Sequence, residues 1–422
     1  MRPLRKLTRE ILAQNTGRDF DRLTLKCAAM REDAFAFFRG TNALFLRMLP
    51  RQDPLFRAPA ILTCGDLHLE NLGAFKGDNR LVYFDLNDFD EACLAPFTLE
   101  LVRFVASIHM AAPGLKIKSA AARRLGKEFL AAYAAAILDG KPRWIERSIA
   151  TGVFRTLLRR TMQRTRVELL DRLTRRKADT RRLRTGVRAL PIAEVERSKL
   201  KRFLSRACEP GLGRRFFKLL DAARRVAGNG SLGLPRWVLL VRGHGSPNAN
   251  FVLDLKYAAP SAPAEWLKIP QPDFGCEGER VVAIQRVMQA IPPALLQPVH
   301  FENRSFVLKE LQPMVDRLAL AQWQDRPKRI TQAIVGMARV AAWAHLRGCG
   351  HYGASAAESL QAYAATRRWQ AAVERLAQKA AKRTLAAWRA YAEDFDAGAV
   401  TEALKAAAGK GGGSSALYFK AP

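Results

Sequence analysis

Residues 64–92 read CGDLHLENLGAFKGDNRLVYFDLNDFDEA, an acid-rich loop followed by two short apolar runs with a turn between them. The apolar runs and the turn at 77–79 predict a β-hairpin. The second run ends in a cluster of carboxylates: Asp85, Asp88, Asp90 and Glu91. Carboxylates crowded at the end of a strand repel one another, and a divalent cation or a proton relieves the repulsion. We therefore expect this segment to carry the chemistry of the protein.

The polar residues of the segment have the spacing of a phosphotransferase catalytic loop. Asp66 is followed by Asn71 five residues later and by Asp85 nineteen residues later. In that chemistry Asp66 orients or deprotonates the acceptor hydroxyl, and Asn71 and Asp85 bind Mg²⁺. Because several acids follow the strand, Asp88 and Asp90 are further candidate metal ligands.

His68 completes the catalytic loop, and we expect it to support the loop through a hydrogen bond rather than to act as a base. Two-metal phosphoesterases also contain the pattern G-D-x-H. They require a D-x-H motif upstream and a G-N-H motif downstream, and this sequence has neither. The pattern therefore favours the phosphotransferase interpretation.

Residues 226–313 are β-rich over a long stretch and predict a small lobe. Strands are expected at 236–241, 251–256 and 305–310, with a helix at 279–290. A G-x-G-x-x-G motif precedes the first strand, an order that suits a glycine loop folded over nucleotide phosphates. An ordinary surface turn is the alternative. The candidate nucleotide-binding residues of this loop are Gly228, Gly230, Ser231 and Gly233.

Lys256 lies near the end of the second of these strands, and Glu279 opens the helix that follows. Kinases hold the α- and β-phosphates of ATP with a strand lysine that pairs with a helix glutamate. We therefore expect Lys256 to pair with Glu279, and Glu277 is the competing partner. The motif Asp-Phe-Gly at 273–275 matches the kinase magnesium motif in letters, but no catalytic loop precedes it. We interpret it as a turn.

The rest of the chain is predicted to be mainly helical. Apolar residues recur at helical spacing at 4–12, 35–49, 98–110 and 330–346, and further helices are expected at 116–138, 143–175 and 214–226. Arg39 is a candidate phosphate ligand, with a salt-bridged helix residue as the alternative. The block at 155–188 holds thirteen Arg and Lys residues against three acids. It is either an anion-binding face or a solvated helix with a flexible end.

The chain has 422 residues and a formal charge of +31. Its length predicts more than one lobe. Its charge favours nucleic acids, anionic membranes or phosphorylated ligands as partners, with a generally basic surface as the alternative. No apolar run reaches transmembrane length, the charged N-terminus lacks the pattern of a secretory signal, and the six cysteines are scattered. We therefore expect a cytoplasmic protein.

Several phrases of the sequence resemble the domain of unknown function 2252 family, a bacterial family placed among kinase-like folds and distantly similar to aminoglycoside phosphotransferases. They are FAFFRG at 35–40, CGDLHLENLG at 64–73, FDLNDFDE at 84–91, GSLG at 230–233 and AH at 344–345. The resemblance implies a fold and a site more firmly than a substrate. This chain departs from the family pattern at 348–351, where Gly-Cys-Gly-His replaces an acidic residue. It departs again at Glu100, which replaces an aspartate and which we expect to brace the catalytic loop.

The kinase elements occur in an unusual order, because the catalytic loop precedes the glycine loop. A circular permutation accounts for this order. We therefore expect an α+β, two-lobed protein-kinase-like fold, circularly permuted, with a mainly helical large lobe and a small antiparallel β lobe. The expected parts are 1–225 with the catalytic loop and metal site, 226–313 as the nucleotide-covering lobe with a hinge at 308–313, 314–408 completing the large lobe, and a flexible tail at 409–422.

The sequence thus predicts a kinase-like phosphotransferase that moves a phosphoryl group from Mg-ATP to a hydroxyl of an unknown acceptor, a small molecule or a protein. Two alternatives remain open. The same fold could transfer AMP, or the protein could bind nucleotide or nucleic acid through its basic surface without catalysis.

Overall fold

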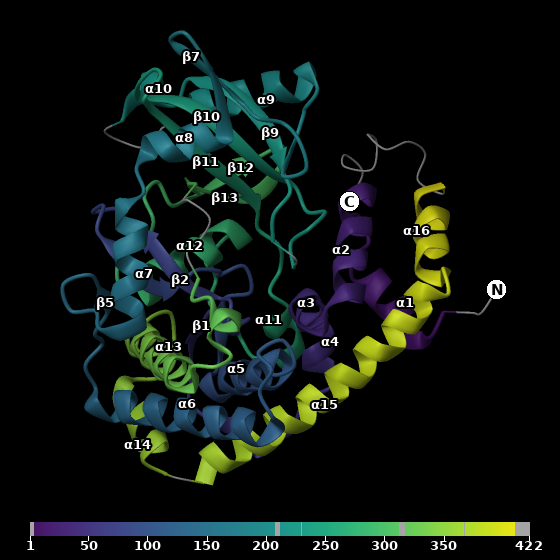
Figure 1. Ribbon diagram of the computed structural model, residues 1–422, viewed down its shortest axis with the longest axis vertical. Coiled ribbons are helices and arrows are strands. Elements are labelled where there is room, and N and C mark those ends of the chain that lie inside the picture. The colour runs from purple at the N-terminus through teal and green to yellow at the C-terminus, as the bar shows by residue number, and fades with distance from the viewer. Residues whose placement is uncertain (1–3, 207–211, 229, 312–316, 367, 410–422) are drawn as a thin grey trace.

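The computed structural model describes residues 4–206, 212–228, 230–311, 317–366 and 368–409. Its architecture is α+β: a large antiparallel sheet lies at one end of the molecule, and helices build most of the rest (Figure 1). The expected α+β class is therefore confirmed. The expected tail lies outside the described residues from position 410 onward.

The helices of the described part are α1 (Lys6–Ala13), α2 (Phe20–Glu32), α3 (Ala34–Gly40), α4 (Asn42–Arg47), α5 (Phe97–Ala111), α6 (Ser119–Asp139), α7 (Gly152–Gln163), α8 (Arg166–Leu173), α9 (Glu194–Arg206), α10 (Gly213–Phe216), α11 (Ala262–Leu267), α12 (Glu277–Met288), α13 (Pro327–Gly348), α14 (Ala357–Ala365), α15 (Arg368–Asp396) and α16 (Ala399–Gly409). The strands are β1 (Ala60–Thr63), β2 (Leu72–Lys76), β3 (Val82–Leu86), β4 (Cys93–Pro96), β5 (Ile145–Glu146), β6 (Thr174–Lys177), β7 (Thr180–Leu183), β8 (Ala189–Leu190), β9 (Leu219–Arg225), β10 (Arg236–Gly245), β11 (Ala249–Tyr257), β12 (Gln297–Phe301) and β13 (Arg304–Glu310).

Six of the described strands form the large sheet in the order β12-β13-β11-β10-β9-β8, with antiparallel neighbours throughout. Strand β10 is apolar over several consecutive residues because both faces of the sheet are covered. On one face Leu239 belongs to the same buried cluster as Leu204 of α9. On the other face Leu240 packs in a cluster with Leu170 of α8.

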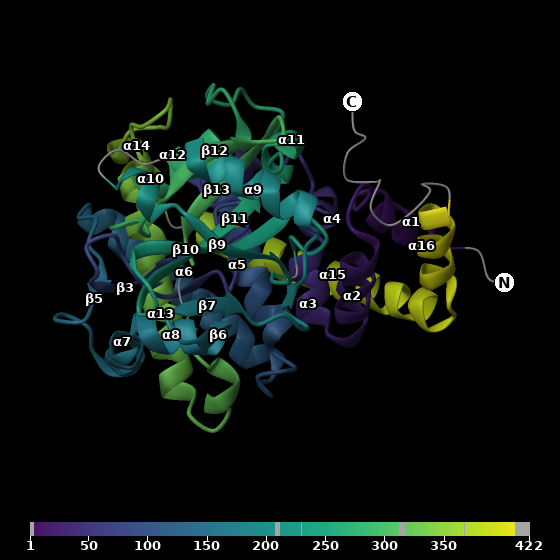
Figure 2. The same cartoon turned by 90° about the horizontal axis from the view of Figure 1, so that it is seen from above.

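The helical part is centred on α5, which is buried on nearly all sides. Helices α6, α13 and α15 lie close to it or to one another in this core. Helix α15 then runs on to the N-terminal helices (Figures 1 and 2), where Tyr391 is buried in a separate cluster with Leu23 and Val400. None of the described helices combines the length and the apolar composition needed to cross a lipid bilayer.

Two short antiparallel pairs position the expected site. Strand β1 pairs with β4, and β2 pairs with β3. Strand β1 leads directly into the loop at 64–71, whereas the connection from β3 to β4 is the acidic loop at 87–92. Pairing of β1 with β4 therefore holds the two loops next to each other.

The structure confirms the hairpin of β2 and β3, the strands β10, β11 and β13, and the helices α5, α6, α12 and α13. The helix expected at 214–226 is wrong, because α10 ends at Phe216 and the chain continues as strand β9. Hydrogen bonding of β9 along the edge of β10 outweighs the helical pattern of this basic run. The sheet therefore includes β8 and β9, which lie before the start of the small lobe expected at 226–313. The edge strand β12 lies within that range, but we did not predict it.

The single helix expected at 143–175 is also wrong. This segment contains β5, α7 and α8, and a capping box between Thr165 and Glu168 starts α8. The sequence Thr-x-x-Glu is the signal that marks this boundary. The basic block ends in a β-hairpin of β6 and β7, so it is not one solvated helix.

Candidate functional site

Asn71 joins the two loops of the site. Its Nδ2 donates hydrogen bonds to the carbonyl oxygens of Asp66 (3.0 Å) and Asp88 (3.1 Å), and its Oδ1 accepts one from the backbone N–H of Asp88 (2.8 Å). The backbone N–H of Asn87 also donates to the Asn71 carbonyl (3.0 Å). The side-chain amide that we expected to bind Mg²⁺ is thus engaged at both ends in holding the loops together.

Gly65 lies where the two loops approach most closely. Its φ is +80°, and a Cβ atom at this position would lie 1.7 Å from the carbonyl oxygen of Glu91. Its N–H donates to Glu100 (2.5 Å), whose other carboxylate oxygen contacts His345 (2.7 Å), which in turn contacts the hydroxyl of Tyr133 (2.7 Å). The prediction that Glu100 braces the loop at 64–71 is confirmed.

Asp66 is held by an arginine from α5. Nε of Arg103 donates to Oδ1 of Asp66 (2.8 Å), and the guanidinium lies over the rings of Phe38 (3.5 Å) and Phe45 (4.5 Å). Burial raises the pKa of Asp66, and the attraction of Arg103 counteracts part of this effect. Asp66 is therefore a positioned carboxylate with a raised affinity for protons, which suits a general base. Arg103 was not among the predicted site residues.

His68 has the supporting role that we expected. Its Nδ1 accepts a hydrogen bond from the backbone N–H of Glu70 (3.1 Å), and burial, reinforced by nearby arginines, lowers its pKa well below the usual range. Arg39 forms an ion pair with the carboxylate of Glu70, which also binds Arg317 (2.6 Å). The structure thus shows the salt-bridged alternative for Arg39.

Asp85 is held by partners outside the loop at 87–92. It is buried, and its carboxylate accepts hydrogen bonds from the backbone N–H groups of Leu86 (2.8 Å) and Ala290 (2.9 Å) and lies 3.4 Å from Arg347. These donors come from β3, from the segment after α12 and from α13. Asp85 therefore ties three elements together, and the metal role that we expected for it stays a prediction.

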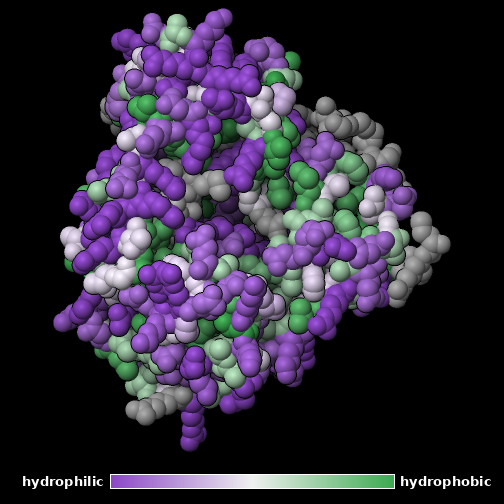
Figure 3. Space-filling view, in the orientation of Figure 1, coloured by the Kyte–Doolittle hydropathy of each residue, from purple (hydrophilic) through white to green (hydrophobic). Residues whose placement is uncertain are grey.

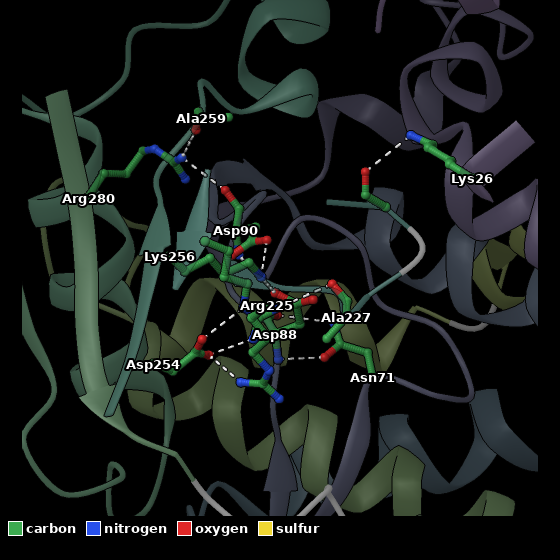
Figure 4. A network of polar contacts seen from close by, with 12 residues as sticks. Lys26, Asn71, Asp88, Asp90, Arg225, Ala227, Asp254, Lys256, Ala259 and Arg280 are labelled. Carbon is green, nitrogen blue, oxygen red and sulfur yellow. Dashed lines mark hydrogen bonds and ion pairs between the residues drawn. The ribbon is translucent and has the colours of Figure 1, made fainter. Parts of the chain in front are cut away.

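Lys256 brings the large sheet to the acidic loop. Its Nζ forms an ion pair with Asp90 and lies 3.5 Å from Oδ1 of Asp88 (Figure 4). Asp88 precedes this lysine of β11 by 168 residues in the chain. The sequence placed all three in one site, but it did not predict that they would contact one another.

The predicted pairing of Lys256 with Glu279 is wrong. The two glutamates at the start of α12 have other neighbours. Glu277 forms an ion pair with Arg280 (2.5 Å). The carboxylate of Glu279 lies beside Gly275, and a Cβ atom added to Gly275 would be 2.9 Å from it. Among the described residues Lys256 pairs with Asp88 and Asp90 instead. Sequence spacing identified the lysine but could not give the direction in which α12 presents its acids.

A second ionic cluster lies beside Lys256 on the sheet. Asp254, two residues earlier on β11, binds Arg225 (2.9 Å) and Arg236 (2.5 Å), and Lys309 of β13 is its cross-strand neighbour. Burial opposes ionisation of Asp254, but the two arginines outweigh it and lower its pKa. Burial and repulsion by Lys256 lower the pKa of Lys309. Sequence reasoning missed these residues, although charged residues inside apolar strands were a usable signal.

The pKa values of Asp88 and Asp90 shift in opposite directions. Partial loss of hydration opposes ionisation of Asp88, but attraction by Lys256 and Lys309 outweighs it and lowers the pKa. Desolvation and repulsion by Asp88 raise the pKa of Asp90. Asp88 keeps 59% of its side-chain surface exposed, so its carboxylate is open to solvent.

The donor set fits Mg²⁺ only together with phosphate. No group of three or more His, Cys, Asp or Glu side chains is arranged as a metal site within the described residues. Mg²⁺ usually takes one or two carboxylates and completes its shell with phosphate oxygens and water. Asp88 and Asp90 could supply two such carboxylates.

The glycine loop is docked on the N-terminal helices. Its first and last glycines have positive φ (80° and 90°), and a turn follows at 231–234. Arg18 donates to the carbonyl oxygens of Gly230 and Leu232 (2.7 Å each), and the buried Lys26 donates to Gly230 (3.1 Å; Figure 4). Ser231 and Gly233 therefore lie in this turn, Gly228 and Gly230 precede it, and the role of all four in nucleotide binding stays a prediction.

Comparison with known proteins gives one match. No curated protein and no solved structure matches the chain. A family model described as "Uncharacterized protein conserved in bacteria (DUF2252)" matches residues 18–394, which include both loops of the site and the whole sheet. The chain therefore belongs to this DUF2252 family.

Proposed function

We propose that the protein is a kinase-like phosphotransferase that moves the γ-phosphoryl group of ATP to a hydroxyl of an acceptor. The observation that carries the proposal is the meeting of Lys256, on a sheet, with Asp88 and Asp90, on the loop that Asn71 attaches to Asp66. A cation for phosphates, carboxylates for a metal and a positioned base thus lie in adjoining elements. This is the set of groups that phosphoryl transfer requires.

The cationic side of the site is suited to a triphosphate. Lys256 and Lys309 lie close enough to lower the pKa of Lys309 by repulsion, and among the described residues Lys309 has no ion-pair partner within 4.0 Å. Phosphate oxygens would relieve this repulsion and pair with both lysines. Arg236 is held against Asp254 and would keep the local potential positive.

Asp88 and Asp90 would hold Mg²⁺, which neutralises charge on the phosphates during transfer. Lys256 would exchange these carboxylates for phosphate oxygens. The ion pair between Lys256 and Asp90 would open when phosphate oxygens bind the lysine. The exposed carboxylate of Asp88 is the ligand most open to an incoming ion.

Asp66 would receive the proton of the acceptor hydroxyl. The acceptor oxygen forms a bond to the γ-phosphorus while the bond from that phosphorus to the bridging oxygen of ADP breaks. Arg103 fixes one carboxylate oxygen of Asp66 and leaves the other for the acceptor. The raised pKa of Asp66 makes it a better proton acceptor than an ordinary aspartate.

Spatial neighbours support a permuted kinase-like order. The segment after α13 approaches the start of β1: the backbone N–H of Ser355 donates to the carbonyl of Ala60 (2.8 Å), and a Cβ at Gly348 would lie 3.1 Å from Leu62. In space, α13 therefore leads toward β1 and the catalytic loop, as the helix before the catalytic loop does in the unpermuted arrangement. Of the hinge expected at 308–313, only residues 308–311 belong to the described part of the chain.

The first test separates binding from chemistry. Thermal denaturation with ATP, with and without Mg²⁺, measures binding, and release of γ-labelled phosphate to water or to components of a cell extract measures transfer. Asp66→Asn should lower transfer by about 10²- to 10⁴-fold and keep the Mg-ATP stabilisation. Lys256→Met should weaken ATP binding about 10- to 100-fold, the cost of a lost charge-assisted hydrogen bond.

Asp88→Asn should remove the magnesium-dependent part of the stabilisation. Asp78→Asn, at the exposed turn of the β2–β3 hairpin, is the matched control and should behave as the wild type. Full turnover by Asp66→Asn, or a wild type that ATP does not stabilise, would contradict the proposal. The mass added to an acceptor distinguishes phosphoryl from AMP transfer.

A further inference from the structure

The β6–β7 hairpin presents a basic face that is outside the proposed active site. Side chains alternate between the two faces of a strand, and Thr174, Arg181 and Leu183 are buried on the inner face. Leu183 packs there with Leu170 in the cluster beneath the sheet. The alternate residues, all exposed, form the outer face: Arg175, Lys177, Thr180, Arg182 and Arg184.

The outer face gathers like charges side by side. Arg175 lies directly opposite Arg182 in the hairpin register, and like charges at such positions destabilise a strand pair. Arg175 and Lys177 have no ion-pair partner within 4.0 Å among the described residues. Arg182 comes only to 4.0 Å from Asp221, whose carboxylate is already engaged by Arg197.

The nearby acids do not neutralise this face. Asp171 binds the inner Arg181 (2.6 Å), and Glu168 is used in the capping box that starts α8. Asp179 is the third acid of the basic block and lies in the exposed turn between the strands. The hairpin therefore keeps a net positive outer surface at a cost in stability, which indicates an anionic partner.

We infer that this outer face binds the phosphate backbone of a nucleic-acid duplex. A two-stranded ribbon is one of the shapes that enter a duplex groove, and arginine and lysine are its ordinary phosphate contacts. The segment 174–184 contains no aromatic residue on which unpaired bases could stack. It also has no large apolar side chain on its outer face, which a membrane-surface element would insert into lipid.

The position of the hairpin is compatible with such a partner. Strand β7 lies at the top of the molecule in Figure 1, at the opposite end from helices α6 and α14. The surface at that end is mainly hydrophilic, whereas the middle of the same face is hollowed (Figure 3). A rod-like duplex could therefore lie on the hairpin without entering the region of Asp88 and Lys256.

The expected binding is sequence-independent and steeply dependent on salt. Four cations on one face predict a slope of about −3.6 in log K against log salt concentration, since each phosphate contact contributes about −0.9. Affinity should then fall by roughly two orders of magnitude between about 50 and 200 mM salt. Removing three of the four cations should reduce the slope to about −0.9.

The experiment measures fluorescence anisotropy of labelled duplex DNA and duplex RNA of one sequence over a salt series. The variant Arg175→Gln/Lys177→Gln/Arg182→Gln is compared with Arg123→Gln/Arg124→Gln/Lys127→Gln, which removes the same charge from exposed positions of α6. A third variant, Arg175→Lys/Arg182→Lys, keeps the charge of the hairpin and should retain binding. Circular dichroism and thermal denaturation check that all variants fold.

Loss of affinity and slope in the hairpin variant alone supports the inference, and the two duplexes then tell which nucleic acid is preferred. Equal loss in the α6 variant shows a general charge effect and overturns it, as does a wild type that binds neither duplex. Vesicles of equimolar phosphatidylcholine and phosphatidylserine form a further arm. If the hairpin variant loses vesicle binding but keeps duplex binding, the partner is a membrane and the inference is wrong.

Discussion

Glu91 is the last acid of the loop at 87–92, and it keeps its proton at pH values at which most glutamates are ionised. Burial raises its pKa to about 8, assisted by repulsion from Asp66 and Asp90 and opposed by the hydrogen bond that the N–H of Ala262 donates to it (2.7 Å). An unfolded glutamate has a pKa of about 4.3. Between these two values the folded chain holds a proton that the unfolded chain has released.

This difference predicts how stability depends on pH. The contribution of Glu91 is fully present below about pH 4.3 and is lost as the pH rises through its folded pKa. Relative to Glu91→Gln, the wild type should lose about 1.4 kcal/mol of unfolding free energy per pH unit from roughly pH 5 to pH 8. Urea denaturation of both proteins across this range measures the effect, and parallel stability curves would contradict it.

At the scale of the element, the turn after β1 depends on one glycine. Gly65 combines a φ of +80° with a position that leaves no room for a side chain, since its Cβ would overlap the Glu91 carbonyl. Gly17 has nearly the same φ (+79°), but nothing lies within 4 Å of a Cβ there. Alanine substitutions at the two glycines therefore distinguish the cost of backbone strain from the cost of steric overlap.

We predict that Gly65→Ala lowers the unfolding free energy by about 3 kcal/mol or more, from the combined cost of the left-handed backbone and of overpacking. Gly17→Ala should cost only about 1–2 kcal/mol, because the backbone term acts alone. Chemical denaturation measures both. Equal losses in the two variants would show that the loops can separate at no cost.

At the scale of the whole molecule, α15 connects the helical core to the glycine loop through the N-terminal helices. Tyr391 is fully buried near its end, and its hydroxyl donates to the carbonyl of Cys27 in α2 (3.1 Å). Arg18, just before α2, holds the carbonyl oxygens of the glycine loop. A change in α15 should therefore reach the loop through α2.

Tyr391→Ala should lower the unfolding free energy by about 3–5 kcal/mol through the cavity that it leaves. It should also speed hydrogen exchange in α2 and at 230–234 while α5 keeps its protection. Arg389→Ala, an exposed position on the same helix, is the control. Unchanged exchange at 230–234 in the tyrosine variant would show that the loop is held independently of α15.

Local sequence patterns were sufficient to predict some of the strands and one loop of this protein. Short apolar runs identified β10, β11 and β13, and the spacing of Asp66, Asn71 and Asp85 drew attention to the loop that Glu100 braces. Such features depend on residues close together in the chain, where periodicity and turn chemistry act directly. The same reasoning failed at β9, because its hydrogen bonds to the neighbouring strands β10 and β8 set its conformation and outweigh its own helical pattern.

By itself the sequence determined which side chains make up the proposed site: a loop aspartate, a strand lysine and a row of acids after a strand. Only the tertiary structure decided how they are paired. It turned Asp85 toward Arg347, Glu277 toward Arg280 and Lys256 toward Asp88 and Asp90. The physical reason is that an ion pair depends on the distance and direction between two elements, and these are set by packing of the sheet, α12 and α13 rather than by spacing along the chain.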